Sequence, residues 1–149
     1  MRLPHPLRVL LVEDQVQNQK WEKQLLTNLG CKVDIVKNGL EAVNRVIADK
    51  NKYAVLLMDV FMPVMNGIEA TKKIREFERE NKREKTAIIV VTGNYTKYDR
   101  VRALQLDVND FICKPLEKDV IFQCLKKVSE SLIKDKKILI LDGENYSSL

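Results

Sequence analysis

Residues 53–67 decide the fold of this chain and read Tyr-Ala-Val-Leu-Leu-Met-Asp-Val-Phe-Met-Pro-Val-Met-Asn-Gly. The first six of these residues, Tyr53 to Met58, are apolar without a break and end at Asp59. Strands that are buried on both faces have this composition, and parallel sheets are built from them. We therefore expect a buried central strand whose carboxyl end presents an aspartate.

Apolar runs and helical patterns alternate on both sides of this strand. Short strands are predicted near residues 8–12, 31–35, 87–91 and 110–113, and helices near 16–29, 39–47, 68–81, 97–106 and 118–133. Five strand–helix units of this kind predict an α/β fold with a parallel sheet between two layers of helices. In three of these helices the apolar residues fall on one face of the helix, and we expect that face to be buried. Trp21, Ile47 and Val120 are among these residues.

Length and composition favour one cytoplasmic domain. The 149 residues are 45% hydrophobic, and no apolar run approaches the roughly 18 residues of a membrane span. The N-terminal residues lack the apolar segment of a secretory signal. Cys31, Cys113 and Cys124 are scattered and show no metal-binding or redox spacing, which fits a reducing compartment. We expect one domain over 7–133, followed by a charged linker and tail over 134–149.

The net charge of +5 does not by itself indicate a nucleic-acid partner. Its densest source, residues 72–85, interleaves lysines and arginines with glutamates. Mixed signs at helical spacing are typical of a solvated helix face with local ion pairs. We therefore expect no direct nucleic-acid binding and no membrane contact.

Polar side chains follow four of the predicted strands at the point where each strand ends. They are Glu13 and Asp14, Asp59, Thr92 and Lys114. Taken singly, Asp14 could cap a helix, Thr92 could be a turn residue and Lys114 could lie in an ordinary loop. Ligands of open α/β sheets bind beyond the carboxyl ends of the strands, and all of these residues map to that edge. Their joint placement favours one functional site.

Three carboxylates at one edge repel each other unless a cation or a proton joins them. Mg²⁺ suits such a site because it is a hard ion that prefers oxygen ligands. Zinc does not suit it, since His5 is the only histidine. A carboxylate beside such a metal can attack phosphorus, and Lys114 and Thr92 would then supply positive charge and a hydrogen-bond donor.

The motifs at these strand ends resemble the defining segments of response-regulator receiver domains. The similar segments are Val9 to Asp14, Asn38 to Ala42, Leu57 to Gly67, Val91 to Gly93 and Lys114-Pro115. This resemblance implies a flavodoxin-like, doubly wound (βα)5 sandwich with strand order 2-1-3-4-5. It also implies a phosphorelay role, in which Asp59 receives a phosphoryl group from a histidine kinase or histidine phosphotransfer protein and signals to a downstream effector.

The resemblance assigns a role to each site residue. Asp59 is the phosphoacceptor and a metal ligand, with Asp14 binding Mg²⁺ directly, Glu13 through water, and Phe61 through its backbone carbonyl. Thr92 and Lys114 bind the phosphoryl group, and a cis peptide bond is expected at Lys114-Pro115. Thr92 and Phe111 form the switch that remodels the surface of helix four, strand five and helix five. The domain would catalyse only its own phosphorylation and dephosphorylation.

Phe61 departs from the family pattern, because many members have a polar side chain at this position. Our hypothesis is that its ring shields the acyl phosphate and lengthens the phosphorylated lifetime. Two alternatives remain, a phosphorylation-independent binding module and an aspartyl-nucleophile phosphatase. The second needs another aspartate where Phe61 stands. Residues 137–142 repeat the shape of residues 8–13, so the tail is an extra strand or the start of another domain, as in a hybrid sensor kinase.

Overall fold

Five strands form one parallel sheet at the centre of the molecule. The computed structural model describes residues 1–48, 52–93, 101, 105–135, 137–138 and 147–148. The strands are β1 (Arg8–Val12), β2 (Lys32–Val36), β3 (Val55–Asp59), β4 (Ala87–Thr92) and β5 (Asp110–Cys113). They are all parallel and lie in the order β2-β1-β3-β4-β5, which confirms the predicted fold class.

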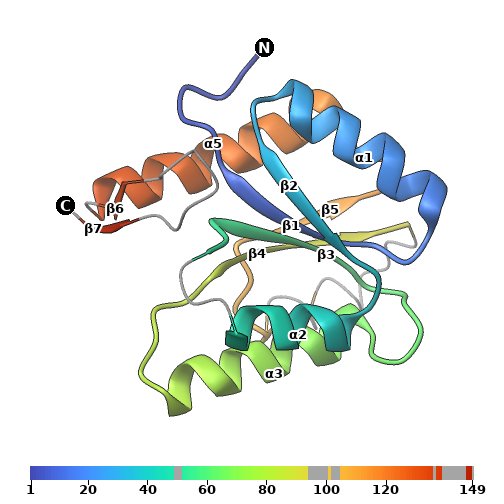
Figure 1. Ribbon diagram of the computed structural model, residues 1–149, viewed down its shortest axis with the longest axis vertical. Coiled ribbons are helices and arrows are strands. Elements are labelled where there is room, and N and C mark those ends of the chain that lie inside the picture. Colours follow the sequence, from blue (N-terminus) through green and yellow to red (C-terminus); the bar gives the residue numbers. More distant parts are fainter. Residues whose placement is uncertain (49–51, 94–100, 102–104, 136, 139–146, 149) are drawn as a thin grey trace.

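Helices cover both faces of this sheet. They are α1 (Val16–Asn28), α2 (Gly39–Ala48), α3 (Gly67–Glu80) and α5 (Lys118–Lys134). Helices α1 and α5 lie on one face and α2 and α3 on the other (Figure 1). The helix predicted over 97–106 falls largely on residues outside the described part of the chain.

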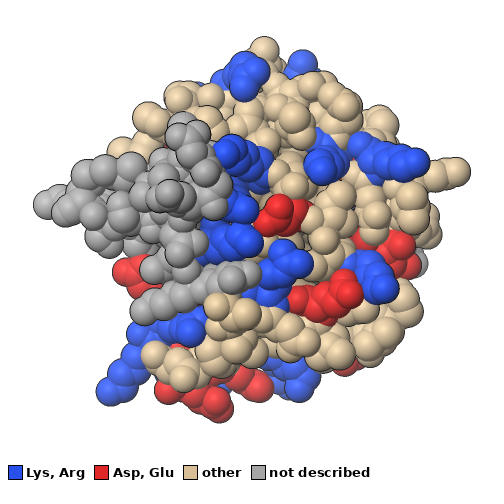
Figure 2. Space-filling view, in the orientation of Figure 1, with Lys and Arg blue, Asp and Glu red and all other residues tan. Residues whose placement is uncertain are grey.

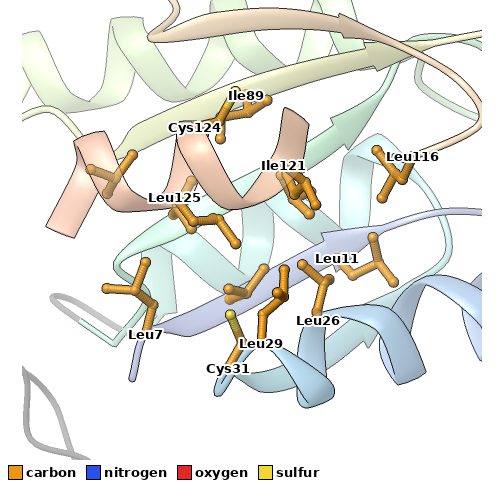
Figure 3. Packing of buried hydrophobic residues seen from close by; sticks show 14 of the residues in the cluster. Leu7, Leu11, Leu26, Leu29, Cys31, Ile89, Leu116, Ile121, Cys124 and Leu125 are labelled. Atoms are coloured by element: carbon orange, nitrogen blue, oxygen red, sulfur yellow. The ribbon is translucent and has the colours of Figure 1, made fainter. Parts of the chain in front are cut away.

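Alternate residues of the strands enter two separate cores. Val9 and Leu11 of β1 face α1 and α5, whereas Leu10 and Val12 face α2 and α3. Figure 3 shows the first core, where side chains of β1, β4, α1 and α5 point toward one another. Burial on both faces explains why β3 is apolar throughout, since all five of its residues are buried.

Three apolar side chains that the helical patterns placed on inward faces lie largely outside the core. Trp21 is 52% exposed, Val120 44% and Ile47 40%. Each stands next to a residue that is buried, namely Glu22, Ile121 and Val46. Neighbouring residues of an α-helix point about 100° apart, so the residue beside an inward position turns toward the edge of the buried stripe. The prediction for these three side chains was wrong.

Basic and acidic side chains are interspersed on the face of the molecule shown in Figure 2. On β2, the Asp34 carboxylate forms ion pairs with Arg8 at 3.5 Å, Lys52 at 3.8 Å and Arg45 at 4.0 Å.

None of the described helices is both long enough and apolar enough to cross a membrane. In the tail, β6 (Lys137–Ile138) pairs antiparallel with β7 (Ser147–Ser148), apart from the main sheet.

Candidate functional site

The predicted site residues come together because the sheet is parallel. Glu13 and Asp14 follow β1, Asp59 ends β3, Thr92 ends β4 and Lys114 follows β5. The backbone hydrogen bonds continue past the strands at this edge, from Val60 N–H to the Val91 carbonyl at 3.1 Å and from Lys114 N–H to the Thr92 carbonyl at 2.7 Å. These bonds fix the spacing of the loops that carry the polar side chains.

Lys114 is the central cation of the site. Its Nζ donates a hydrogen bond to Asp59 Oδ2 at 3.1 Å and a second one to Glu13 Oε1. The other carboxylate oxygen of Glu13, Oε2, accepts from the backbone N–H of Gln15 at 3.2 Å. Lys114 thus binds carboxylates from two different strand ends, and the peptide bond that follows it is cis, as predicted.

Glu13, Asp14 and Asp59 form a cluster that fits a small divalent cation. Each offers a carboxylate oxygen, and these three oxygens lie within 4.8 Å of one another. Glu13 and Asp59 are buried, whereas Asp14 is half-buried and leaves the cluster open to solvent. An all-oxygen set with an open side suits Mg²⁺, which usually keeps several waters and takes only one or two carboxylates directly.

The electrostatics of the cluster show that it is short of positive charge. Burial raises the pKa of Asp59 to about 6, and the attraction of Lys114 only partly offsets this effect. Burial also raises the pKa of Asp14, and neighbouring Glu13 adds to the rise. The pKa of Glu13 is lowered, since its hydrogen bonds from Lys114 and Gln15 outweigh its burial. Lys114 alone therefore does not fully compensate the ionised form of Asp59, and a metal ion would supply further positive charge.

Gly67 allows the loop after β3 to fold back against the end of that strand. A Cβ atom at this position would lie 2.0 Å from the backbone carbonyl oxygen of Asp59. The Gly67 N–H donates to the Val60 carbonyl at 2.9 Å, which closes the loop. Any larger side chain would push this loop away from Asp59.

The remaining predicted residues lie at or near this edge of the sheet. Thr92 is fully buried at the end of β4, and Phe111 of β5 is half-buried against the core under α2 and α3. Phe61 lies two residues after Asp59 with 57% of its surface exposed. The switch roles of Thr92 and Phe111 and the metal contact of the Phe61 carbonyl stay predictions.

Glu22 is a site residue that the sequence patterns did not predict. It lies in the middle of α1, its side chain is 6% exposed, and its Oε1 lies 4.0 Å from Lys114 Nζ. The periodicity of the helix contained the signal, because Leu26 and Leu29 follow it at four and seven residues and both are buried. A glutamate at such a position points inward together with the leucines.

The sequence model of the response regulator receiver domain matches residues 9–126. The chain is 33% identical over 147 residues to "Hybrid signal transduction histidine kinase I" of Dictyostelium discoideum, in a match that covers 97% of this chain and 8% of that protein. It is 38% identical over 123 residues to "Two-component response regulator 24" of Arabidopsis thaliana, which covers 83% of this chain and 84% of that protein. The chain thus spans a small part of the hybrid kinase and most of the plant regulator.

Solved structures of receiver domains are also similar to this chain. The receiver domain of sensor histidine kinase PA1611 from Pseudomonas aeruginosa has a TM-score of 0.70 and 33% sequence identity, over 83% of this chain and 98% of that one. That structure holds a magnesium ion coordinated in its active site cleft. The fold and the strand order of the present chain agree with this similarity.

Proposed function

Because the chain belongs to the response regulator receiver domain family of two-component signalling, we propose that Asp59 accepts a phosphoryl group in a phosphorelay. The observation that carries this proposal is the contact of Asp59 Oδ2 with Lys114 Nζ at 3.1 Å, beside the two other carboxylates of the cluster. Asp59 ends a strand that is buried on both faces, so its carboxylate is held at a fixed place at the edge of the sheet.

The proposed reaction moves a phosphoryl group from a phosphohistidine to Asp59. An ionised Asp59 oxygen attacks phosphorus, the P–N bond breaks, and its electron pair remains on the imidazole nitrogen. Because its pKa is about 6, Asp59 is mostly ionised at neutral pH and can act as the nucleophile. Lys114 is within reach of the incoming phosphoryl oxygens, and Thr92 stands at the end of the neighbouring strand.

Glu13, Asp14 and Asp59 would hold Mg²⁺, with the Phe61 carbonyl as a further ligand. When bound, the ion neutralises charge on the phosphoryl oxygens and so assists both phosphorylation and hydrolysis. The three carboxylate oxygens within 4.8 Å support this assignment. The domain acts in this way on its own aspartate, as a regulatory domain rather than an enzyme with a separate substrate.

The signal passes to partner proteins. A histidine kinase or a histidine phosphotransfer protein is the proposed donor, and an effector protein or domain is the proposed receiver of the signal. Movement of Thr92 toward the phosphoryl group and rotation of Phe111 would change the surface near β5 and α5, the general logic of a phosphorylation switch. The three cysteines are free, which fits the proposed cytoplasmic location.

The test is Mg²⁺-dependent phosphorylation by acetyl phosphate, followed by intact-protein mass spectrometry. We expect a single added phosphoryl group on the wild type with Mg²⁺, and none in EDTA or in Asp59→Asn. Asp119→Asn is the matched control, since Asp119 is exposed on α5 and is not one of the three carboxylates of the cluster. Equal modification of wild type and Asp59→Asn would refute the proposal and favour a binding module that works without phosphorylation.

A further inference from the structure

Glu22 is a buried carboxyl group to which the proposed phosphotransfer assigns no role. It lies in α1 on the face that packs against the sheet, with 4% of its surface exposed. Glutamate is rarely buried to this extent unless it has a partner. The polar contact that the structure gives it is the Lys114 ammonium, whose Nζ lies 4.0 Å from Glu22 Oε1.

Burying the ionised Glu22 carboxylate costs folding free energy, and packing alone does not explain why a glutamate stands here. Burial raises the pKa of Glu22 to about 7, Lys114 lowers it, and the charges of Glu13 and Asp59 raise it further. An apolar residue at this place would continue the stripe of Leu26 and Leu29 without that cost. The ion pair with Lys114 is the feature that accounts for a carboxyl group at this position.

Lys114 has three N–H donors, and three carboxylates surround it. Two of them, Glu13 and Asp59, are also proposed ligands of Mg²⁺. The ammonium and the metal ion therefore compete for the same oxygens. Glu22 is the carboxylate next to Lys114 that stands outside the metal cluster, so it can hold the ammonium without taking an oxygen from the cation.

We propose that Glu22 is a positioning residue that holds the Lys114 ammonium beside the metal cluster and thereby favours Mg²⁺ binding by Glu13, Asp14 and Asp59. This inference rests on the proposed function, since it concerns the same cation site. Without the Glu22 carboxylate, Lys114 is bound by Glu13 and Asp59 alone, and the incoming cation has to displace it from both.

The experiment is a double-mutant cycle on Mg²⁺ affinity, measured by isothermal titration calorimetry. The four proteins are the wild type, Glu22→Gln, Lys114→Gln and the double variant. A pH of about 8 keeps the Glu22 carboxyl ionised, given its pKa of about 7. We expect Glu22→Gln to weaken Mg²⁺ binding roughly three- to tenfold in the wild-type background, the scale of a partly buried ion pair. In the Lys114→Gln background the same substitution should change the affinity less than twofold.

Two controls separate this role from other effects. Glu80→Gln removes an exposed carboxylate at the end of α3, so it shows what the loss of one distant charge does to Mg²⁺ affinity. Glu22→Met tests the same position with an apolar side chain, and it should weaken binding as Glu22→Gln does. Circular dichroism shows whether each variant is folded.

The outcomes distinguish the inference from the proposed function. An unchanged affinity in Glu22→Gln and Glu22→Met would overturn the inference, and so would an equal loss in both Lys114 backgrounds. In either case the proposed function would still stand if the wild type binds Mg²⁺ and Asp14→Asn does not. Wild-type protein that binds no Mg²⁺, or binds it equally well in Asp14→Asn, would overturn both.

Discussion

Replacing Asp59 by asparagine is expected to stabilise the folded protein when no divalent cation is present. Asparagine keeps the shape of the side chain and removes the negative charge. Asp59 is 7% exposed and shares its surroundings with Glu13 and Asp14, so its ionised form is disfavoured in the folded state. The variant that abolishes the proposed phosphorylation should therefore be the more stable protein.

The pKa of Asp59 gives the size and the sign of this effect. Burial raises that pKa from 3.8 to about 6, and a difference of this size corresponds to about 3 kcal/mol. Solvent at the open edge of the sheet screens part of the cost, so we expect a gain of about 1–2 kcal/mol in the free energy of unfolding. The folded state binds this proton more tightly than the unfolded chain, so the contribution of Asp59 to stability falls as the pH rises from about 4 to about 6. The advantage of Asp59→Asn is therefore complete above about pH 6 and absent below about pH 4.

The assay is urea unfolding in EDTA, followed by far-UV circular dichroism at about pH 7.5 and about pH 5. The gap between wild type and Asp59→Asn should be larger at the higher pH. Asp119→Asn, at an exposed position, should stay within about 0.5 kcal/mol of the wild type. Added Mg²⁺ should stabilise the wild type more than Asp59→Asn and so narrow the gap, because a ligand that binds only the folded state shifts the unfolding equilibrium. An Asp59→Asn variant that is no more stable than the wild type in EDTA at pH 7.5 would refute this reasoning.

Three further substitutions test the loop after β3. Gly67→Ala should lower the free energy of unfolding by about 2 kcal/mol or more, since its Cβ would lie 2.0 Å from the Asp59 carbonyl oxygen, and a wild-type urea midpoint would contradict the close approach. Val64→Asn should raise the free energy of unfolding by up to about 1 kcal/mol, because Val64 has a φ of 69° that a β-branched residue adopts at a cost, and a lower urea midpoint would argue against this strain. Phe61→Gln should shorten the phosphorylated lifetime several-fold if the ring shields the acyl phosphate, measured as loss of the added phosphoryl mass over time. An unchanged or longer lifetime would remove that role for Phe61.

The sheet and most of the site could be predicted because their signals lie within short stretches of sequence. The apolar run before Asp59 indicates a buried strand, and parallel order then places every strand end at one edge. Contact between Lys114 and Asp59 follows from that order, although 55 residues separate them. The structure adds what the order of strands leaves open, namely that Lys114 binds Glu13 as well as Asp59.

The helices were predicted less completely, because their faces depend on the layer they pack against. Trp21 and Glu22 illustrate this point. Hydrophobicity alone places Trp21 inside and Glu22 outside, and the structure has the reverse. The rotation of α1 is set by Leu26 and Leu29, which are both buried, and this rotation carries Glu22 inward beside Lys114. A helical position is therefore assigned by the whole buried stripe, not by the character of one side chain.

The balance of charge links the stability of this edge to its proposed function. Lys114 pairs with three carboxylates, those of Glu13, Glu22 and Asp59, and the Asp14 carboxylate lies in the same cluster as two of them. Repulsion of this kind would push the loops apart if they were loosely held. They are held by backbone hydrogen bonds beyond the strand ends and by the close approach at Gly67, so the carboxylates stay together. Burial, with the neighbouring negative charges adding to it, then raises the pKa values of Asp59 and Glu22. A rigid backbone frame keeps this excess negative charge in place for a cation, and this is why removing the Asp59 carboxylate should increase stability while it weakens Mg²⁺ binding.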